Sequence, residues 1–188
     1  MNTKHYSSRF ILALTAVSAL LVAIGLPQAG LAQETASPTK ARVGIYDSRA
    51  VAVAFAGSAP FNRWLGGLKA EHEKAKASGD QKRVAELEAE GAAGQRLLHM
   101  QGFSTAPVSN ILDQIKDQLP ALKEKAGVSV LVSKWDKEGL AQHKDAARVD
   151  VTMALVDAFS PSERQRKSAI AIQEHEPIPL KEAEQIKD

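Results

Sequence analysis

The five histidines are the side chains of this 188-residue chain best suited to acid–base or metal chemistry. They are widely separated, and neither HExxH nor another two-histidine ligand spacing occurs. The sequence also lacks Gly-x-Ser-x-Gly, which exposes a serine nucleophile, and the glycine-rich phosphate loop. It contains no cysteine, which excludes a disulfide, a thiolate metal site and a cysteine nucleophile. We therefore expect no catalytic residue, no metal and no cofactor.

Acidic residues cluster at Glu71/Glu73 and at Glu86/Glu88/Glu90, where they alternate with lysine and arginine. This pattern favours a solvated helix face over a metal cage. His143 precedes Lys144 and Asp145, which suggests an acid–base group, but the segment reads as a polar connection. An exported enzyme would need groups converging around His143 or His99. The sequence shows no such convergence, so we predict that the protein is not an enzyme.

The N-terminal segment has the layout of a secretory signal peptide. Lys4 and Arg9 precede an apolar run of 17 residues, Phe10–Leu26, and the small residues Gly30 and Ala32 follow. The alternative is an uncleaved anchor, but the run is shorter than the roughly 18–20 residues that span a bilayer. We predict a cleaved signal peptide at 1–32. No second run of comparable length follows, so we expect no stable membrane insertion after cleavage.

The charge balance of the remaining chain argues against nucleic-acid binding. Beyond residue 32 the sequence holds 22 basic and 22 acidic side chains. A nucleic-acid binder needs surplus cations to displace counterions from phosphates. Nucleic acid is therefore not an expected partner.

Alternating apolar residues predict a small β body. After a polar, flexible linker at 33–41, a strand is expected near 42–47 and a stronger one near 128–133. The segment 135–140 predicts a turn followed by another short strand or extended piece. Ser48 is expected to cap the helix that follows the first strand, and Thr152 is expected to cap the helix that follows residue 150.

Helical periodicity dominates the middle of the chain. A helical hairpin is expected over about 60–100, with its tip at Ser78-Gly79-Asp80 and Asp80 capping the return helix. Its apolar seam includes Gly91 and Gly94, which either weaken the helix by about 1 kcal/mol each or permit close approach of the two helices. A further helix over about 107–126 should kink at Pro120 and end at Gly127.

The C-terminal segment 160–188 is expected to form a helix and a tail. Ser160 is expected to begin a capping box for the helix, and the tail after about residue 173 is expected to fray. One chain supplies perhaps three strands, which is little for an independent sheet. Pairing between copies would bury the sheet edges, so we expect an oligomer.

This order of elements resembles the Skp/OmpH family of periplasmic chaperones. The matching pieces are residues 42–55, an arm at about 60–126, residues 127–136 and residues 148–159. The resemblance implies an α+β, mostly helical OmpH-like domain at 42–159 with a projecting antiparallel helical hairpin. It also implies a homotrimer in the periplasm whose arms hold unfolded outer-membrane proteins without ATP or metal.

The resemblance leads to two functional hypotheses. The first is a holdase-type chaperone for unfolded outer-membrane proteins. The second is an exported, envelope-associated structural or interaction protein that reuses the scaffold without chaperone activity. The arm favours the second hypothesis through its charge, since residues 60–126 hold ten basic and nine acidic side chains and no basic cluster for lipopolysaccharide.

Apolar residues of the arm are the expected client-binding surface. Each of them has an equally simple interpretation as packing between the two helices. The candidates are Trp64, Leu65, Leu68, Leu87, Leu97 and Leu98.

Overall fold

The computed structural model describes residues 41–186, which belong to one compact unit. The predicted signal peptide at 1–32 lies outside the described residues, as does the linker at 33–41 except for Ala41. Within residues 41–186, no helix combines the length and the apolar character needed to cross a membrane.

Three short parallel strands form the sheet. They are β1 (Arg42–Tyr46), β2 (Val130–Ser133) and β3 (Ala147–Asp150), and their order is β2-β1-β3. In the observed register Val43 pairs with Val130 on one side and with Arg148 on the other. The expected strands near 42–47 and 128–133 are therefore present, and both lie in a mostly helical α+β fold.

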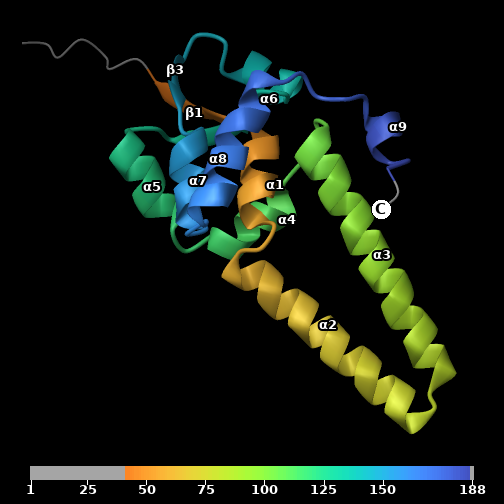
Figure 1. The fold of residues 1–188 in the computed structure, drawn as a ribbon. Coiled ribbons are helices and arrows are strands. Elements are labelled where there is room, and N and C mark those ends of the chain that lie inside the picture. The colour runs from red at the N-terminus through yellow and green to blue at the C-terminus, as the bar shows by residue number, and fades with distance from the viewer. Residues whose placement is uncertain (1–40, 187–188) are drawn as a thin grey trace, which may run out of the picture. The chain divides into compact units, whose positions relative to one another are not determined.

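Helices make up most of the remaining described chain (Figure 1). In chain order they are α1 (Ser48–Phe55), α2 (Ala59–Ser78), α3 (Gln81–Phe103), α4 (Ser109–Leu112), α5 (Leu119–Ala126), α6 (Lys137–Gln142), α7 (Thr152–Ala158), α8 (Glu163–Ala171) and α9 (Leu180–Ala183), with 3-10 turns η1 (Asp113–Ile115) and η2 (Ile172–Glu174).

The main hydrophobic core lies between one face of the sheet and the helices α1, α4, α7 and α8. Ala50, Ile111 and Leu155 are fully buried in it. Gly44 leaves room for this packing at the sheet, because a Cβ there would lie 2.9 Å from Leu131 Cδ2. Helix α6 packs against β2 instead. Its Gly139 approaches Val132, whose side chain points to the opposite face from Leu131 because side chains alternate along a strand.

One chain supplies three strands, the number that the sequence suggested, and β2 and β3 are the outer ones. Helices bury one face of this sheet, which gives three strands the cover that they need to be stable. Pairing of the sheet edges between copies, and with it the homotrimer, stays a prediction.

Helices α2 and α3 extend away from the sheet and converge toward their shared tip (Figure 1), where Ala75 of α2 packs with Val84 and Leu87 of α3. Gly79 ends α2 with φ of 72°, a left-handed conformation that suits glycine. The carboxylate of Asp80 then accepts a hydrogen bond of 3.0 Å from the backbone N–H of Arg83. The predicted turn at Ser78-Gly79-Asp80 and the cap at Asp80 are thus confirmed.

Alanine substitutions at Gly67, inside α2, and at Gly79, just after its end, should have opposite effects on the free energy of unfolding. Neither Cβ would meet an atom within 4 Å, so only backbone conformation matters. Gly79→Ala should lower the free energy of unfolding by about 1–2 kcal/mol, because its φ is positive. Gly67→Ala lies inside α2 and should raise it by about 0.5–1 kcal/mol. Urea denaturation measures both, and equal signs would contradict the observed turn.

The extended helix pair ends at Phe103, whereas the sequence suggested an arm over about 60–126. Residues 108–126 instead join the body through Val108 and Ile111 in the main core. The expected single helix is also broken into α4, η1 and α5. Pro120 begins α5 rather than kinking a longer helix, since its missing N–H is tolerated in a first turn.

Three helix starts differ from the expected caps by one or two residues. Asp47, not Ser48, caps α1 by accepting from Arg49 N. Thr152 is the first residue of α7 and accepts a 3.0 Å hydrogen bond from Asp47 N instead of capping its own helix. The capping box of α8 begins at Ser162 rather than Ser160. At α1 and α8 a neighbouring polar side chain has the cap geometry, whereas the N-cap of α7 is Val151, which makes no side-chain cap hydrogen bond.

The segment after Trp135 is a helix, not the turn followed by a short strand or extended piece that the sequence suggested. Asp136 caps α6 by accepting a 2.9 Å hydrogen bond from Gly139 N. The next strand, β3, begins only at Ala147. The cap at Asp136 therefore starts a helix where an extended segment was expected.

The C-terminal segment is held against the body and α3, although fraying was expected after about residue 173. The carbonyl of His175 accepts from Arg49 Nη1 at 2.8 Å. The N–H of Ile178 donates to the carbonyl of Phe103 at 3.0 Å, and Ala183 of α9 is buried. Residues 160–186 are thus integrated with the fold that begins at β1.

Candidate binding groove between α2 and α3

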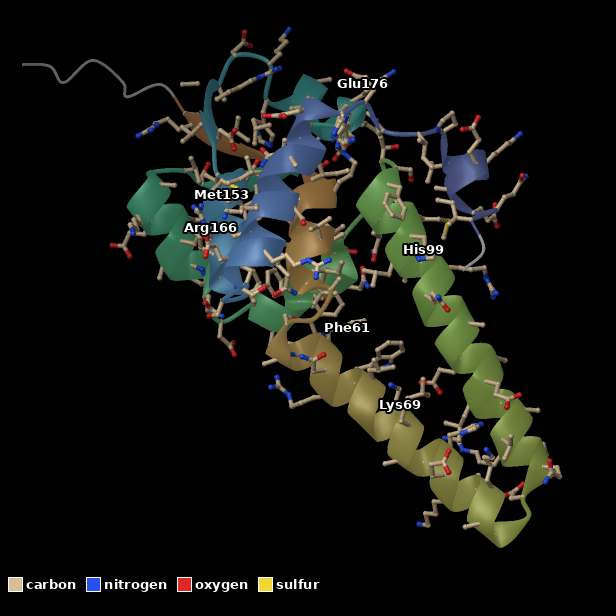
Figure 2. The ribbon with its side chains drawn as sticks, in the orientation of Figure 1. Phe61, Lys69, His99, Met153, Arg166 and Glu176 are labelled. Atoms are coloured by element: carbon tan, nitrogen blue, oxygen red, sulfur yellow. The ribbon has the colours of Figure 1, made fainter. Side chains whose placement is uncertain are left out.

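Apolar side chains line a groove between α2 and α3. Figure 2 shows Phe61 near the start of α2 and His99 on the half of α3 closer to the sheet. One hollow of about 430 Å³ is bordered by Phe61, Trp64, Leu65 and Leu98, together with Gly91, Gly94, Gln95 and His99. A second hollow of about 470 Å³ lies farther along the pair, between Leu65 and Leu87. The helix pair therefore leaves part of its apolar seam unfilled.

Glycines on α3 allow the two helices to approach. A Cβ at Gly94 would lie 2.7 Å from the ring of Trp64, and one at Gly91 would lie 3.3 Å from Leu68 Cδ2. Because real Cβ contacts are essentially never as short as 2.7 Å, only glycine at position 94 admits the indole in this place. Both glycines thus make room for a side chain of α2, while their effect on the stability of α3 stays a prediction.

Two of the six exposed large hydrophobic side chains among the described residues lie beside this seam. Trp64 is 38% exposed and Leu97 is 39% exposed, which is high for side chains of their size. Aromatic contacts connect Trp64 to the body: its ring centroid is 5.7 Å from that of Phe61, which lies 5.6 Å from Phe55. The groove thus presents apolar surface on a wall anchored in the main core.

Charged residues line the half of the helix pair near its tip. Arg83 bridges to Glu71 at 2.7 Å across the two helices, and His72 Nε2 lies 3.2 Å from Glu88 Oε1. These pairs are partly or largely exposed, so each contributes little to stability. They keep this half of the pair hydrated and of mixed charge, which is the arrangement expected for the acidic clusters.

The six predicted site residues fall into two groups. Trp64, Leu65, Leu97 and Leu98 border the part of the groove nearest the sheet. Leu68 and Leu87 lie nearer the tip, where Leu87 is only 2% exposed and packs with Ala75 and Val84. Leu87 therefore serves mainly as packing between the helices, while Trp64 and Leu97 are accessible.

Sequence reasoning missed six side chains that border the groove at its body end. The apolar ones are Phe55, Pro60 and Phe61. Phe61 could have been found because it lies three residues before Trp64 on the same helix face. The amides are Gln101, Asn110 and Gln114. No local pattern marks Asn110 or Gln114, since they reach the groove from α4 and η1 through tertiary packing.

The histidines considered for catalysis are placed on separate elements. His99 lies on α3, where its ring centroid is 5.8 Å from that of Phe103, and His143 ends α6. Among residues 41–186 no group of three histidine, aspartate or glutamate side chains is arranged to hold a metal ion.

A second cluster of polar side chains lies at the carboxyl ends of β1 and β2. Asp47 Oδ2 is 2.9 Å from Arg49 Nη2 and 2.6 Å from Lys134 Nζ. Trp135 Nε1 donates to Asp47 Oδ1 at 3.3 Å, and its ring lies 5.0 Å from the Arg49 guanidinium. Asp47 and Arg49 are at most 1% exposed. This cluster connects both strands, α1 and the backbone at His175.

Electrostatics hold the Asp47 carboxylate in its charged form. Burial acts most strongly and by itself would raise the pKa of Asp47. The hydrogen bonds from Arg49 and Lys134, with the positive charge of Arg49, outweigh it and keep the pKa below its ordinary value. Both oxygens already accept hydrogen bonds from several donors, so the cluster stabilises the fold and offers no open carboxylate for chemistry.

Comparison with protein-family models, curated proteins and solved structures finds no match to this chain. The resemblance to the Skp/OmpH family consequently depends on the sequence motifs alone. The groove combines exposed apolar side chains with hollows between two helices, so it can cover an apolar segment of a partner.

Proposed function

We propose that this protein is an exported, ATP-independent holdase-type chaperone that binds unfolded outer-membrane proteins in the periplasm. The observation that supports this proposal is the exposed apolar groove between α2 and α3, with Trp64 and Leu97 on its walls. A contiguous apolar surface rimmed by polar residues is typical of a protein-binding site. Unfolded polypeptides expose the apolar side chains that such a groove can cover.

The charges of the helix pair support the same role. Ion pairs such as Arg83–Glu71 lie near the tip, away from the open apolar part. They keep a loaded chaperone hydrated while the groove shelters apolar segments of the client. Binding through apolar contacts needs no nucleotide, since each contact is individually weak and reversible.

An interaction protein of the envelope is the second candidate. The near-neutral charge of the arm favours it, because residues 60–126 hold ten basic and nine acidic side chains and no basic cluster. This candidate predicts one folded partner recovered by cross-linking. The chaperone predicts many unfolded ones.

Suppression of aggregation tests the chaperone proposal. The purified exported protein should reduce light scattering when a urea-denatured outer-membrane barrel protein is diluted into buffer. Trp64→Ala should raise the concentration needed for half-suppression at least about fivefold, because an aromatic side chain that a bound client covers commonly contributes more than 1 kcal/mol to binding. The matched control is Ile170→Ala, which removes a 41% exposed side chain from α8.

Two results would count against the chaperone. Unchanged scattering with excess protein rejects it, and equal effects of Trp64→Ala and Ile170→Ala place the binding surface outside the groove. The proposed homotrimer is tested separately by the mass of the protein in solution. A mass that corresponds to a stable monomer would reject the homotrimer and would not affect the proposal that the groove binds clients.

A further inference from the structure

The groove ends where α2 and α3 reach α1 and α4, and this junction has its own chemistry. A cavity of about 350 Å³ lies there. Its apolar wall includes Phe61, Trp64 and Leu97, and its polar wall consists of the amides Gln101, Asn110 and Gln114. No charged residue borders it, in contrast to the half of the helix pair near the tip.

Gln101 is the decisive residue of the polar wall. Its side chain is buried, with only 2% of the residue exposed. Its Nε2 donates to the carbonyl of Pro107 at 2.7 Å and to Asn110 Oδ1 at 2.6 Å. Within the part of the chain that the structure describes, Gln101 Oε1 accepts no hydrogen bond. Gln101 Oε1 is not among the buried unpartnered atoms of the described residues, so this acceptor is accessible and a ligand that supplies a donor can bond to it.

The same hydrogen bonds orient Asn110. Because its Oδ1 accepts from Gln101, its Nδ2 is the remaining donor of this exposed amide. The cavity therefore offers an acceptor at Gln101 and a donor at Asn110 beside an aromatic wall. A peptide unit presents the complementary set, with one N–H, one carbonyl and an adjacent side chain.

We propose that the junction cavity binds an uncharged, apolar stretch of extended polypeptide. The main-chain N–H of that stretch donates to Gln101 Oε1, its carbonyl accepts from Asn110 Nδ2, and an apolar side chain packs against Phe61 and Trp64. This inference rests on the proposed function, for which it specifies the recognised chemistry. A charged side chain is excluded because none of the cavity's borders could pair with it.

Backbone-modified peptides test this inference in the unaltered protein. The probe is a short fluorescein-labelled peptide in which Phe and Ser alternate, and fluorescence anisotropy measures its affinity. Ester analogues replace one peptide N–H at a time by oxygen. The ester at the position whose N–H would donate to Gln101 Oε1 should weaken binding about fivefold, since a neutral hydrogen bond contributes roughly 1 kcal/mol. Replacing the central Phe by Asp should weaken binding more strongly.

Variants assign the effect to the cavity. The Gln101→Leu variant should bind the parent peptide and this ester analogue with equal affinity, because the acceptor Oε1 is gone. Asn110→Ala alters an exposed side chain and should weaken the parent peptide while the fold persists. The control Gln142→Leu removes an exposed amide at the end of α6 and should preserve the ester penalty.

The outcomes separate this inference from the proposed function. Equal affinity of all ester analogues, or of the Asp-containing peptide, overturns peptide recognition by the cavity. If the protein suppresses aggregation but does not bind the peptide, peptide recognition by the cavity is overturned and the chaperone proposal is retained. If the loss of affinity depends on the ester position but aggregation is not suppressed, peptide recognition by the cavity is retained and the chaperone proposal is rejected.

Discussion

Replacement of Asp47 by asparagine should lower the free energy of unfolding by about 3–5 kcal/mol, as expected when one partner of a buried ion pair is removed. The change leaves Arg49 charged at 0% exposure and directs an amide toward donors from Arg49, Lys134 and Trp135. Urea denaturation followed by circular dichroism measures the loss.

The matched control is Asp157→Asn. Asp157 pairs with Arg166 at 2.8 Å, but both side chains are about half exposed, so the loss should be no more than about 1 kcal/mol. Equal losses at the two positions would show that the Asp47 cluster does not stabilise the fold as its burial indicates.

The Asp47 cluster also predicts how stability changes with pH. Its folded-state pKa lies below its ordinary value, so the stabilisation is complete above the unfolded pKa of about 3.9. It is lost as the pH falls below this value and through the folded-state pKa. The unfolding free energy of the parent protein should therefore decline more steeply below about pH 4 than that of Asp47→Asn.

Replacement of Ile111 by alanine should destabilise the protein by about 2–5 kcal/mol. Ile111 lies on α4 with 0% exposure, and it packs in the same core as Val51 and Leu155. Truncation removes buried apolar contacts and leaves a cavity that the surrounding helices fill only in part. Thermal and urea unfolding both report the effect, which should lower the midpoint for the whole body.

The control for Ile111→Ala is Leu180→Ala on α9, where the side chain is 47% exposed. That change should fall within about 0.5 kcal/mol of the parent protein. If Ile111 belonged to an extended arm over 60–126, as the sequence alone suggested, its truncation would leave the stability of the body nearly unchanged. A small effect at Ile111 would thus favour the longer arm.

Local rules were most successful where a few neighbouring residues determine the conformation. The tip at Gly79 and Asp80 follows from one positive φ and one side-chain cap, and both are strong local preferences. The end of α5 at Gly127 has the same origin. The strands at Arg42–Tyr46 and Val130–Ser133 follow from β-branched residues in short alternating runs.

Nonlocal packing decided what periodicity left open. The apolar positions of 108–126 fit either a second arm helix or a core segment, because both bury one face. Only the neighbours Ala50 and Leu155, distant in sequence, place Ile111 in the body. The tail is a similar case, since its attachment depends on Arg49 and Phe103, to which no pattern in residues 173–186 points.

The sequence by itself determined the apolar face of α2 and α3 and the residues Trp64, Leu65, Leu97 and Leu98 that border the groove, because a 3.6-residue period specifies a helix face directly. Only the tertiary structure brought Gln101 and Asn110 to the end of that face and left Gln101 Oε1 without a donor among residues 41–186. Their meeting depends on how α3 packs against α4, which is a property of the assembled core and of no single segment.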